Sequence, residues 1–197
     1  MDINNKKDIL KLQDKLKRKL SDSRYLHTIG VAYTAGSLAM KYSCDINTAV
    51  AAGLLHDCAK CLPKEKLKQI ICDLPDLCEG ELINQKTYHA PAGKIIAKNE
   101  FKITDEEILS SIRWHTLGKH NMTDFEKIIY LADKIETKTR PSEWAEPIRK
   151  ALEEENGLNK AMLISYKNTI KSLADRNLKI CKTTVELYNE LLENINF

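Results

Sequence analysis

The chain has 197 residues, 43% of them hydrophobic and 30% charged, with a formal net charge of +3. A chain of this length can bury about two thirds of its unfolded surface in one core. The small positive charge suits an anionic small-molecule substrate and makes nucleic acid an unlikely partner. No apolar run reaches the roughly 18 residues of a membrane span, and the N-terminus has no apolar signal core. We therefore expect no membrane association and a cytoplasmic location.

Apolar residues recur with helical spacing along almost the whole chain. A first amphipathic helix, predicted over about 9–20, has a lysine-rich outer face that we interpret as solvated. Ser21 and its two neighbours supply N-cap chemistry for a second helix over 24–42. Asp45 opens an alanine-rich third helix that we expect near the centre of the core. Pro63 suits the first turn of a short fourth helix.

The middle of the chain is less regular. The segment 73–87 contains a proline, a glycine and several polar breaks, so it is predicted as loop and short helix. Helix resumes in YHAPAGKIIAKNE. Two capping boxes then predict helix starts, the first at Thr104 with Glu107 and the second at Thr123 with Glu126.

The C-terminal part is also predicted as helical. Pro141 ends the preceding helix or follows its end, and the tail from Leu158 is predicted as one long helix or two. No alternating strand pattern is present. We therefore predict an all-α fold with a single domain over 1–197, in which C-terminal helices over about 142–197 pack on a core over about 20–140. The leucine and isoleucine spacing of the tail fits this packing role and a homodimer interface equally well.

Six cysteines are present, and two of them, Cys58 and Cys61, match the pattern C-x-x-C. A structural zinc site would normally need a second such pair, and a redox motif would follow a strand. We interpret the cysteines as reduced and either buried or incidental. A metal or redox module centred on this pair is the alternative.

Histidines and aspartates carry the functional signal. Four of the five histidines stand at or near the ends of predicted helices: His27, His56, His89 and His115. Asp57 follows His56 directly, and Asp133 lies in a mostly apolar helix. A carboxylate in such a stretch is costly unless a cation compensates its charge. That cation is either a metal ion or a neighbouring side chain such as Lys134 or Arg113.

These six side chains form a mixed set of imidazoles and carboxylates. A single helical histidine is more often a hydrogen-bonded core residue than a ligand. Together, however, the six could hold two octahedral ions if one carboxylate bridges, and such a mix suits iron, manganese, zinc or cobalt better than calcium. Two divalent ions with two carboxylates leave a charge of about +2, which would attract a polyphosphate.

Five sequence motifs, in this order along the chain, indicate a particular family of proteins: RYLHTIGVA, AGLLHDCAK, YHAPAG, IRWHTLG and IIYLADKIE. They resemble the HD-domain superfamily of metal-dependent phosphohydrolases and, within it, the YqeK family of symmetrical diadenosine tetraphosphate hydrolases. The resemblance covers about 20–140, which it marks as an HD metal-binding core. It implies that one metal is held by His27, His56, Asp57 and Asp133, and that Asp57 bridges to a second metal completed by His89 and His115. The expected metal is iron, and manganese, cobalt or zinc are the alternatives.

The resemblance also implies roles in catalysis and substrate binding. Asp57 would be catalytic as the bridging ligand, and Lys60 would contact phosphate or assist the leaving group, unless it is a solvent-facing lysine beside the site. Family members usually continue IE-Pro-x-Arg, whereas this chain reads IETKTRPSEW. The resemblance implies that Arg140 could do the work of that arginine as a substrate contact, displaced by one position. His120 matches no ligand, and we place it in a loop near the phosphates with Lys119, a further candidate for substrate binding.

The implied activity is hydrolysis of diadenosine tetraphosphate to two ADP, with no serine or cysteine nucleophile. An alternative keeps the site and changes the substrate to a nucleoside mono- or triphosphate or a cyclic dinucleotide. A non-catalytic nucleotide sensor is a further alternative, which six filled ligand positions disfavour.

Overall fold

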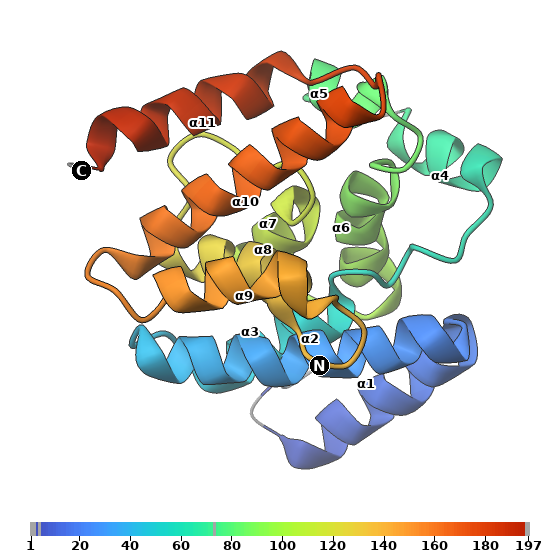
Figure 1. The fold of residues 1–197 in the computed structure, drawn as a ribbon. Coiled ribbons are helices and arrows are strands. Elements are labelled where there is room, and N and C mark those ends of the chain that lie inside the picture. The colour runs from blue at the N-terminus through green and yellow to red at the C-terminus, as the bar shows by residue number, and fades with distance from the viewer. Residues whose placement is uncertain (1–2, 4, 73, 196–197) are drawn as a thin grey trace.

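The computed structural model describes residues 3, 5–72 and 74–195, and within these residues it contains helices and no strand. The all-α prediction is confirmed (Figure 1). The helices are α1 (Lys6–Lys19), α2 (Asp22–Lys41), α3 (Ile46–Leu55), α4 (Lys64–Ile71), α5 (Glu79–Ile83), α6 (His89–Glu100), α7 (Glu106–Trp114), α8 (Asp124–Ile135), α9 (Ser142–Ala151), α10 (Gly157–Asp175) and α11 (Lys182–Asn194). None of them is both long enough and apolar enough to cross a membrane, as far as the described residues show.

Three of the predicted N-cap residues are found at the starts of their helices. The hydroxyl of Ser21 accepts a hydrogen bond at the start of α2, and the carboxylate of Asp45 accepts one at the start of α3. Thr123 and Glu126 form the predicted capping box of α8. Each side chain satisfies a backbone N–H that has no partner within its helix. Pro63 lies immediately before α4 as its N-cap, one position earlier than expected.

The predicted capping box at Thr104 and Glu107 is wrong. Asp105 is the N-cap of α7, and its carboxylate accepts the backbone N–H groups of Glu107 and Ile108 at 2.9 and 3.1 Å. A carboxylate also interacts favourably with the positive end of the helix dipole, whereas a threonine hydroxyl carries no charge. The helix therefore starts one residue later than the box predicts.

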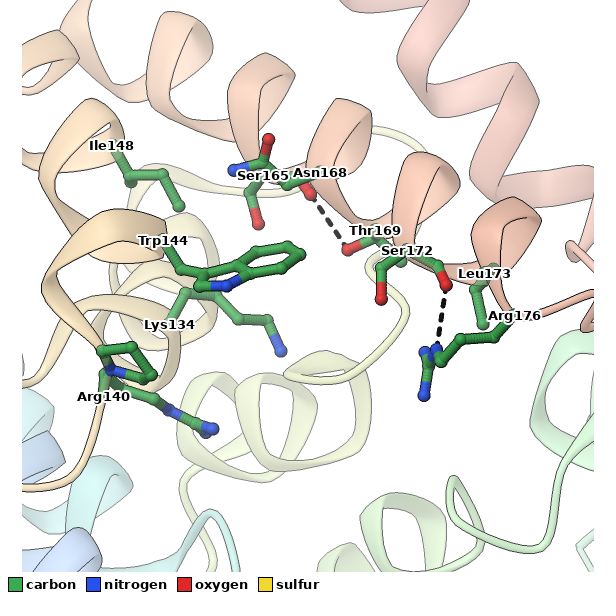
Figure 2. Close-up of a pocket in the computed structure, with 11 residues that line it drawn as sticks. Lys134, Arg140, Trp144, Ile148, Ser165, Asn168, Thr169, Ser172, Leu173 and Arg176 are labelled. Atoms are coloured by element: carbon green, nitrogen blue, oxygen red, sulfur yellow. Dashed lines mark hydrogen bonds between the residues drawn. The ribbon is translucent and has the colours of Figure 1, made fainter.

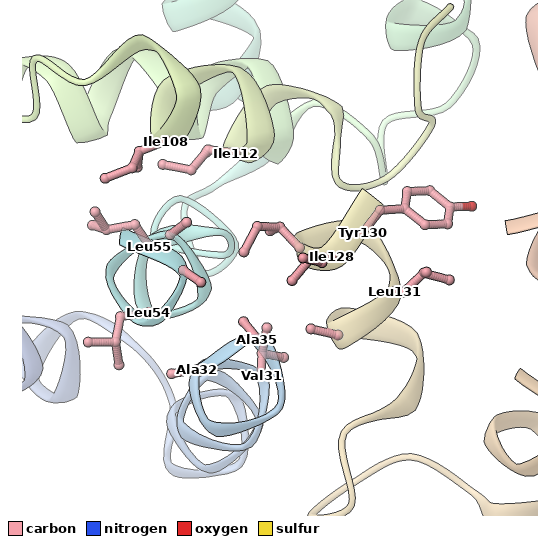
Figure 3. Close-up of a cluster of buried hydrophobic side chains, with 14 of the residues drawn as sticks. Val31, Ala32, Ala35, Leu54, Leu55, Ile108, Ile112, Ile128, Tyr130 and Leu131 are labelled. Carbon is pink, nitrogen blue, oxygen red and sulfur yellow. The ribbon is translucent and has the colours of Figure 1, made fainter. Parts of the chain in front are cut away.

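The central core lies between α2, α3, α7 and α8 (Figure 3). Its fully or nearly fully buried members include Val31, Ala32 and Ala35 of α2, Leu54 and Leu55 of α3, Ile108 and Ile112 of α7, and Ile128 and Leu131 of α8. Small residues on α2 and α3 allow these two helices to approach closely. A methyl group added at Gly53 would lie 2.8 Å from the Cα atom of Ala32, so the crossing tolerates only hydrogen there.

The C-terminal tail forms two helices. At the end of α10, the N–H of Leu178 donates to the carbonyl of Leu173 and the N–H of Asn177 donates to that of Ala174, both at 2.9 Å. Asn177 has a φ of 51°, so this is a Schellman motif, which ends a helix with a left-handed residue. Asparagine tolerates that conformation better than most residues.

The tail helices lie on the opposite side of the molecule from α1 (Figure 1). Helix α10 packs against α8 and α9, and α11 packs against α10. Apolar side chains of the tail contribute to this contact, as shown by the buried side chain of Leu187 on α11. The single domain over 1–197 and the homodimer stay predictions, and residues 1–2, 4, 73 and 196–197 of that domain lie outside the described residues.

The α2–α3 crossing can be tested by a pair of glycine substitutions. Gly53→Ala should lower the free energy of unfolding by about 2 kcal/mol, because overpacking against backbone atoms cannot be relieved by a rotamer change. Gly36→Ala is the matched control on the same helix pair, since its added methyl meets only the side chains of Val50 and Ile46. It should be near neutral, because alanine favours helix over glycine. Urea unfolding measures the free energy of unfolding of both variants. Equal changes in this free energy would contradict the close crossing of α2 and α3 at Gly53.

Candidate metal centre

The six predicted ligands come together from five helices and the turn after α3. Each side chain is buried, with a residue exposure of 5% or less. His27 lies in the second turn of α2, His56 is the C-cap of α3 and Asp57 follows it, His89 is the first residue of α6, His115 is the C-cap of α7, and Asp133 lies in the last turn of α8. Residues separated by more than one hundred positions therefore share one cavity wall.

One group of ligands surrounds the Oδ1 atom of Asp57. The Nε2 atoms of His89 and His115 lie 3.0 and 3.6 Å from this oxygen. The two Nε2 atoms are 3.1 Å apart. Two ligands bound to one ion at about 2.1 Å, at right angles to each other, are separated by about 3 Å. These three atoms are therefore spaced as neighbouring ligands of one cation.

A second group surrounds the other oxygen of the same carboxylate. The Oδ2 atom of Asp57 lies 3.4 Å from Nε2 of His56 and 3.9 Å from Nε2 of His27. The Oδ1 atom of Asp133 lies 3.0 Å from Nε2 of His27 and 3.8 Å from Nε2 of His56. Asp57 thus faces both groups, one oxygen to each, as a bridging carboxylate would.

Hydrogen bonds orient all four imidazoles in the same way. The Nδ1 atom of His56 lies 2.7 Å from the carbonyl oxygen of Gly53, and His89 and His115 make the same contact with the carbonyl three residues earlier. Nδ1 of His27 lies 3.0 Å from a carboxylate oxygen of Glu136. An oxygen acceptor requires a proton on Nδ1, so the Nε2 lone pair of each ring is free to bind a metal.

Unpartnered polar atoms support the same conclusion. Nε2 of His56 and Oδ1 of Asp57 are fully buried and have no hydrogen-bond partner among the described residues. Leaving such atoms without a partner is costly, and native proteins rarely do so without a reason. Both atoms belong to the proposed ligand groups, so a cation would satisfy them. The residues present therefore fit a metal centre.

The electrostatics keep His89, His115 and the two aspartates in their metal-binding forms, whereas the pKa of His56 is raised because the carboxylates of Asp57 and Asp133 outweigh its burial. Burial lowers the pKa of His115 to about 4 and also lowers the pKa of His89, so both rings are neutral at pH 7. Burial opposes the charge of Asp57, but the neighbouring imidazoles, His56 first among them, hold its pKa well below the usual range. Lys134 and His27 do the same for the pKa of Asp133.

Three helices end at the site. The C-terminal ends of α3, α7 and α8 carry His56, His115 and Asp133, respectively. Carbonyl groups without helical partners give a helix C-terminus a partial negative charge, which favours a nearby cation. The fold therefore adds to the attraction that the two carboxylates provide.

Sequence reasoning missed two residues of the site. A guanidinium nitrogen of Arg24 lies 2.7 Å from Oδ2 of Asp57, and Glu136 fixes the His27 ring. Arg24 stands three residues before His27 and Glu136 stands three residues after Asp133, so each shares a helix face with a ligand. This three-residue spacing from a predicted ligand is the signal in the sequence that could have pointed to both residues. It does not show that Arg24 pairs with Asp57 or that Glu136 contacts His27.

The alternative interpretation of Asp133 as a salt-bridged residue is partly correct. The ammonium of Lys134 lies 2.9 Å from Oδ2 of Asp133. Arg113 is engaged elsewhere, because it pairs with Glu81 and Asp76 and ties α5 to α7. Arg140 and the imidazoles of His27 and His56 also lie against this carboxylate, so the ion pair with Lys134 does not exclude a ligand role for Asp133.

The structure brings two of the three predicted substrate contacts to the site. The ammonium of Lys60 lies 3.1 Å from Nε2 of His89 and 4.0 Å from Oδ1 of Asp57. Burial lowers the pKa of this lysine. The guanidinium of Arg140 pairs with the carboxylate of Asp133 and donates to its backbone carbonyl.

Lys119 and His120 face other partners. Lys119 lies 2.7 Å from the buried carboxylate of Glu126, at the start of α8, whereas Asp133 lies in the last turn of that helix. Nδ1 of His120 lies 2.6 Å from Glu190 of α11. The structure therefore does not bring either residue to the ligand groups.

The cysteine pair contributes no ligand. The thiol of Cys58 is buried and donates to the carbonyl of Gly93, whereas Cys61 is exposed. Burial raises the pKa of the Cys58 thiol strongly, so it is not a thiolate at neutral pH. The two potential metal-binding groups found among the described residues consist of His27, His56 and Asp57, and of Asp57, His89 and His115.

The helical bundle and the paired histidines and aspartates define a class of protein, the HD domain hydrolases. The family described as HD domain matches residues 24–138, more than half of the chain. A crystal structure of a predicted HD superfamily hydrolase involved in NAD metabolism, from Clostridium acetobutylicum, is also similar. It is 41% identical with a TM-score of 0.86, covering 94% of this chain and 97% of that chain.

Two curated relatives identify a subgroup within the HD domain family to which the chain is similar. The symmetrical bis(5'-nucleosyl)-tetraphosphatase of Bacillus subtilis (strain 168) is 38% identical over 179 residues, which cover 90% of this chain and 94% of that protein. The protein of the same name from Staphylococcus aureus (strain NCTC 8325 / PS 47) is 32% identical and covers 88% of this chain and 89% of that protein. The chain belongs to the HD domain family and, within it, to the YqeK-type symmetrical bis(5'-nucleosyl)-tetraphosphatases.

The low pKa of His115 predicts a pH-dependent stability of the chelator-treated protein. An unfolded histidine has a pKa near 6.5, and the folded value is about 4, so between these values only the unfolded chain binds the proton. Stability should therefore fall by up to about 3 kcal/mol as the pH drops from about 6.5 to about 4. Urea unfolding across this range should show a shallower slope for His115→Gln. Parallel slopes would contradict the assignment.

Proposed function

We propose that this chain hydrolyses diadenosine tetraphosphate symmetrically to two ADP, with two divalent metal ions in the site. The observation that carries the proposal is the carboxylate of Asp57, which presents one oxygen to each of two imidazole groups. The names of the curated relatives support the substrate and the symmetry of cleavage. The small net positive charge of the chain suits such a polyanion.

Two metal ions would be held by the two groups described above. His27, His56 and Asp133 with Oδ2 of Asp57 would hold one ion, and His89 and His115 with Oδ1 of Asp57 would hold the other. When bound, two divalent ions would polarise the phosphoryl oxygens and lower the pKa of a coordinated water. We propose iron as the metal, with manganese, cobalt or zinc as alternatives, because mixed imidazole and carboxylate sets suit these ions.

Cationic side chains around the site would bind the phosphates. Arg24, Lys134 and Arg140 each pair with a ligand carboxylate, and Lys60 lies beside the ring of His89. Divalent ions would neutralise those carboxylates more strongly, which frees the cationic groups for an anionic substrate. Charge built up on the phosphoryl oxygens during cleavage is stabilised by such fixed positive groups.

Lys60 is suited to protonate the leaving phosphate. Its ammonium is half-buried at the edge of the ligand groups, and burial lowers its pKa from the ordinary lysine value. A general acid is most effective when its pKa lies near the working pH. No serine or cysteine nucleophile is needed, and the buried Cys58 thiol, with its raised pKa, is poorly suited to that role. We place the reaction in the cytoplasm.

Replacement of the bridging ligand tests the two-metal site. Asp57→Asn keeps the shape of the side chain, removes its charge and replaces one carboxylate oxygen by an NH2 group, so the side chain could no longer bridge two ions. We expect ADP formation from diadenosine tetraphosphate to fall by about a thousandfold or more, with bound metal reduced to less than half. His120→Ala is the control, because this histidine contacts Glu190 on α11, and it should keep activity and metal. An active, metal-replete Asp57→Asn would exclude the bridging role.

The proposed role of Lys60 predicts a different outcome. Lys60→Met keeps much of the side-chain volume and removes the ammonium, so kcat should fall by about a hundredfold, the typical contribution of general acid catalysis. Metal content should remain at the wild-type level, because the lysine is not a ligand. Chromatography should still identify ADP as the product. A kcat within threefold of the wild-type value would show that Lys60 is a solvent-facing residue.

A further inference from the structure

A pocket of about 400 Å³ adjoins the ligand groups (Figure 2). It lies between the end of α8, helix α9 with the two residues before it, and helix α10 with the residue after it. Lys134 and Arg140 line it and also pair with the carboxylate of Asp133, so the pocket begins where the metal-binding side chains end. Its volume lies within the range of small-molecule sites.

The pocket carries positive charge and no lining carboxylate. Lys134, Arg140 and Arg176 are its charged residues, and Figure 2 shows their cationic groups directed toward the same open space. Arg176 is held in place because its Nε donates to the carbonyl of Ser172 at 2.8 Å. An anion with several charges would be attracted to this space and could reach Asp133 along Lys134 and Arg140.

An aromatic ring forms one wall. Trp144, near the start of α9, is 46% exposed, and in Figure 2 its indole extends across the pocket toward α10. Ile148 and Leu173 add apolar surface, and Ser165 and Asn168 add hydrogen-bonding groups. A flat aromatic ring beside an amide is suited to a nucleobase, because the ring stacks on its face and the amide bonds to its edge.

We propose that this pocket binds the nucleoside of one ADP half of the substrate, with the base stacked on Trp144 and its phosphates passing Arg140 and Lys134 to the ligand groups. The proposal rests on the proposed function, since it names where one half of that substrate lies. It also gives a role to Arg140, which pairs with Asp133 and lines the pocket. Arg176 would neutralise the phosphates from the opposite wall.

Binding measurements on the metal-loaded protein test the pocket directly. Calorimetry gives the dissociation constants of ADP and of inorganic tripolyphosphate, which has the charges and no base. Trp144→Ala should weaken ADP about tenfold, as expected for loss of base stacking, and leave tripolyphosphate and metal content unchanged. Trp144→Phe should restore most of the ADP affinity. Tyr33→Ala, which removes an exposed aromatic side chain on α2 that does not line the pocket, should change the affinity for neither ligand.

Kinetics separate this proposal from the proposed function. Trp144→Ala should raise KM for diadenosine tetraphosphate about tenfold and keep kcat within twofold. A wild-type protein that binds ADP through Trp144 but does not cleave the tetraphosphate would overturn the proposed function and support the pocket. If the wild-type protein cleaves the tetraphosphate and Trp144→Ala leaves both the ADP affinity and KM unchanged, the pocket proposal alone would be overturned. Fluorescence gives an independent check, since ADP should quench Trp144 in Trp114→Phe, and an unquenched signal would also overturn it.

Discussion

The carboxylate of Asp57 lies between two groups of imidazoles, with one oxygen facing each group. It is almost completely buried, so its negative charge must be compensated by the residues around it. His56 and Arg24 provide part of this compensation within the chain. Two divalent cations would provide the rest, and they would use the same two oxygens. The positions of the other ligands follow from this one anion, because each must reach it from a different helix.

The helices position the ligands through their ends and through one close crossing. The rings of His56, His89 and His115 each bond to a backbone carbonyl three residues earlier, so the local backbone sets their tautomer and direction. The α2–α3 contact at Gly53 brings His27 to the end of α3. Core packing therefore acts on the site, because a shift of either helix would change the spacing between ligands that belong to different segments.

Charge is arranged in two layers around the site. The inner layer contains the imidazoles and carboxylates, and the outer layer contains cations that pair with those carboxylates, among them Arg24, Lys134 and Arg140. Such an arrangement suits a polyphosphate, since the inner layer can bind metal ions and the outer layer can bind phosphate oxygens. The basic pocket beside Trp144 continues the outer layer away from the metal ligands. A phosphate chain with a base at its end has the matching shape and charge.

The sequence by itself determined the helical class and three helix caps, and it identified six candidate ligands, because periodicity and capping are local and because the segments that carry these residues occur in a recognisable order. It could not place residues whose role depends on distances between helices. The pairing of Arg24 with Asp57, the separation of Lys119 from the ligand groups and the pocket between Trp144 and α10 are all of this kind. They are decided when segments far apart in the chain pack together, and only the tertiary structure contains that information.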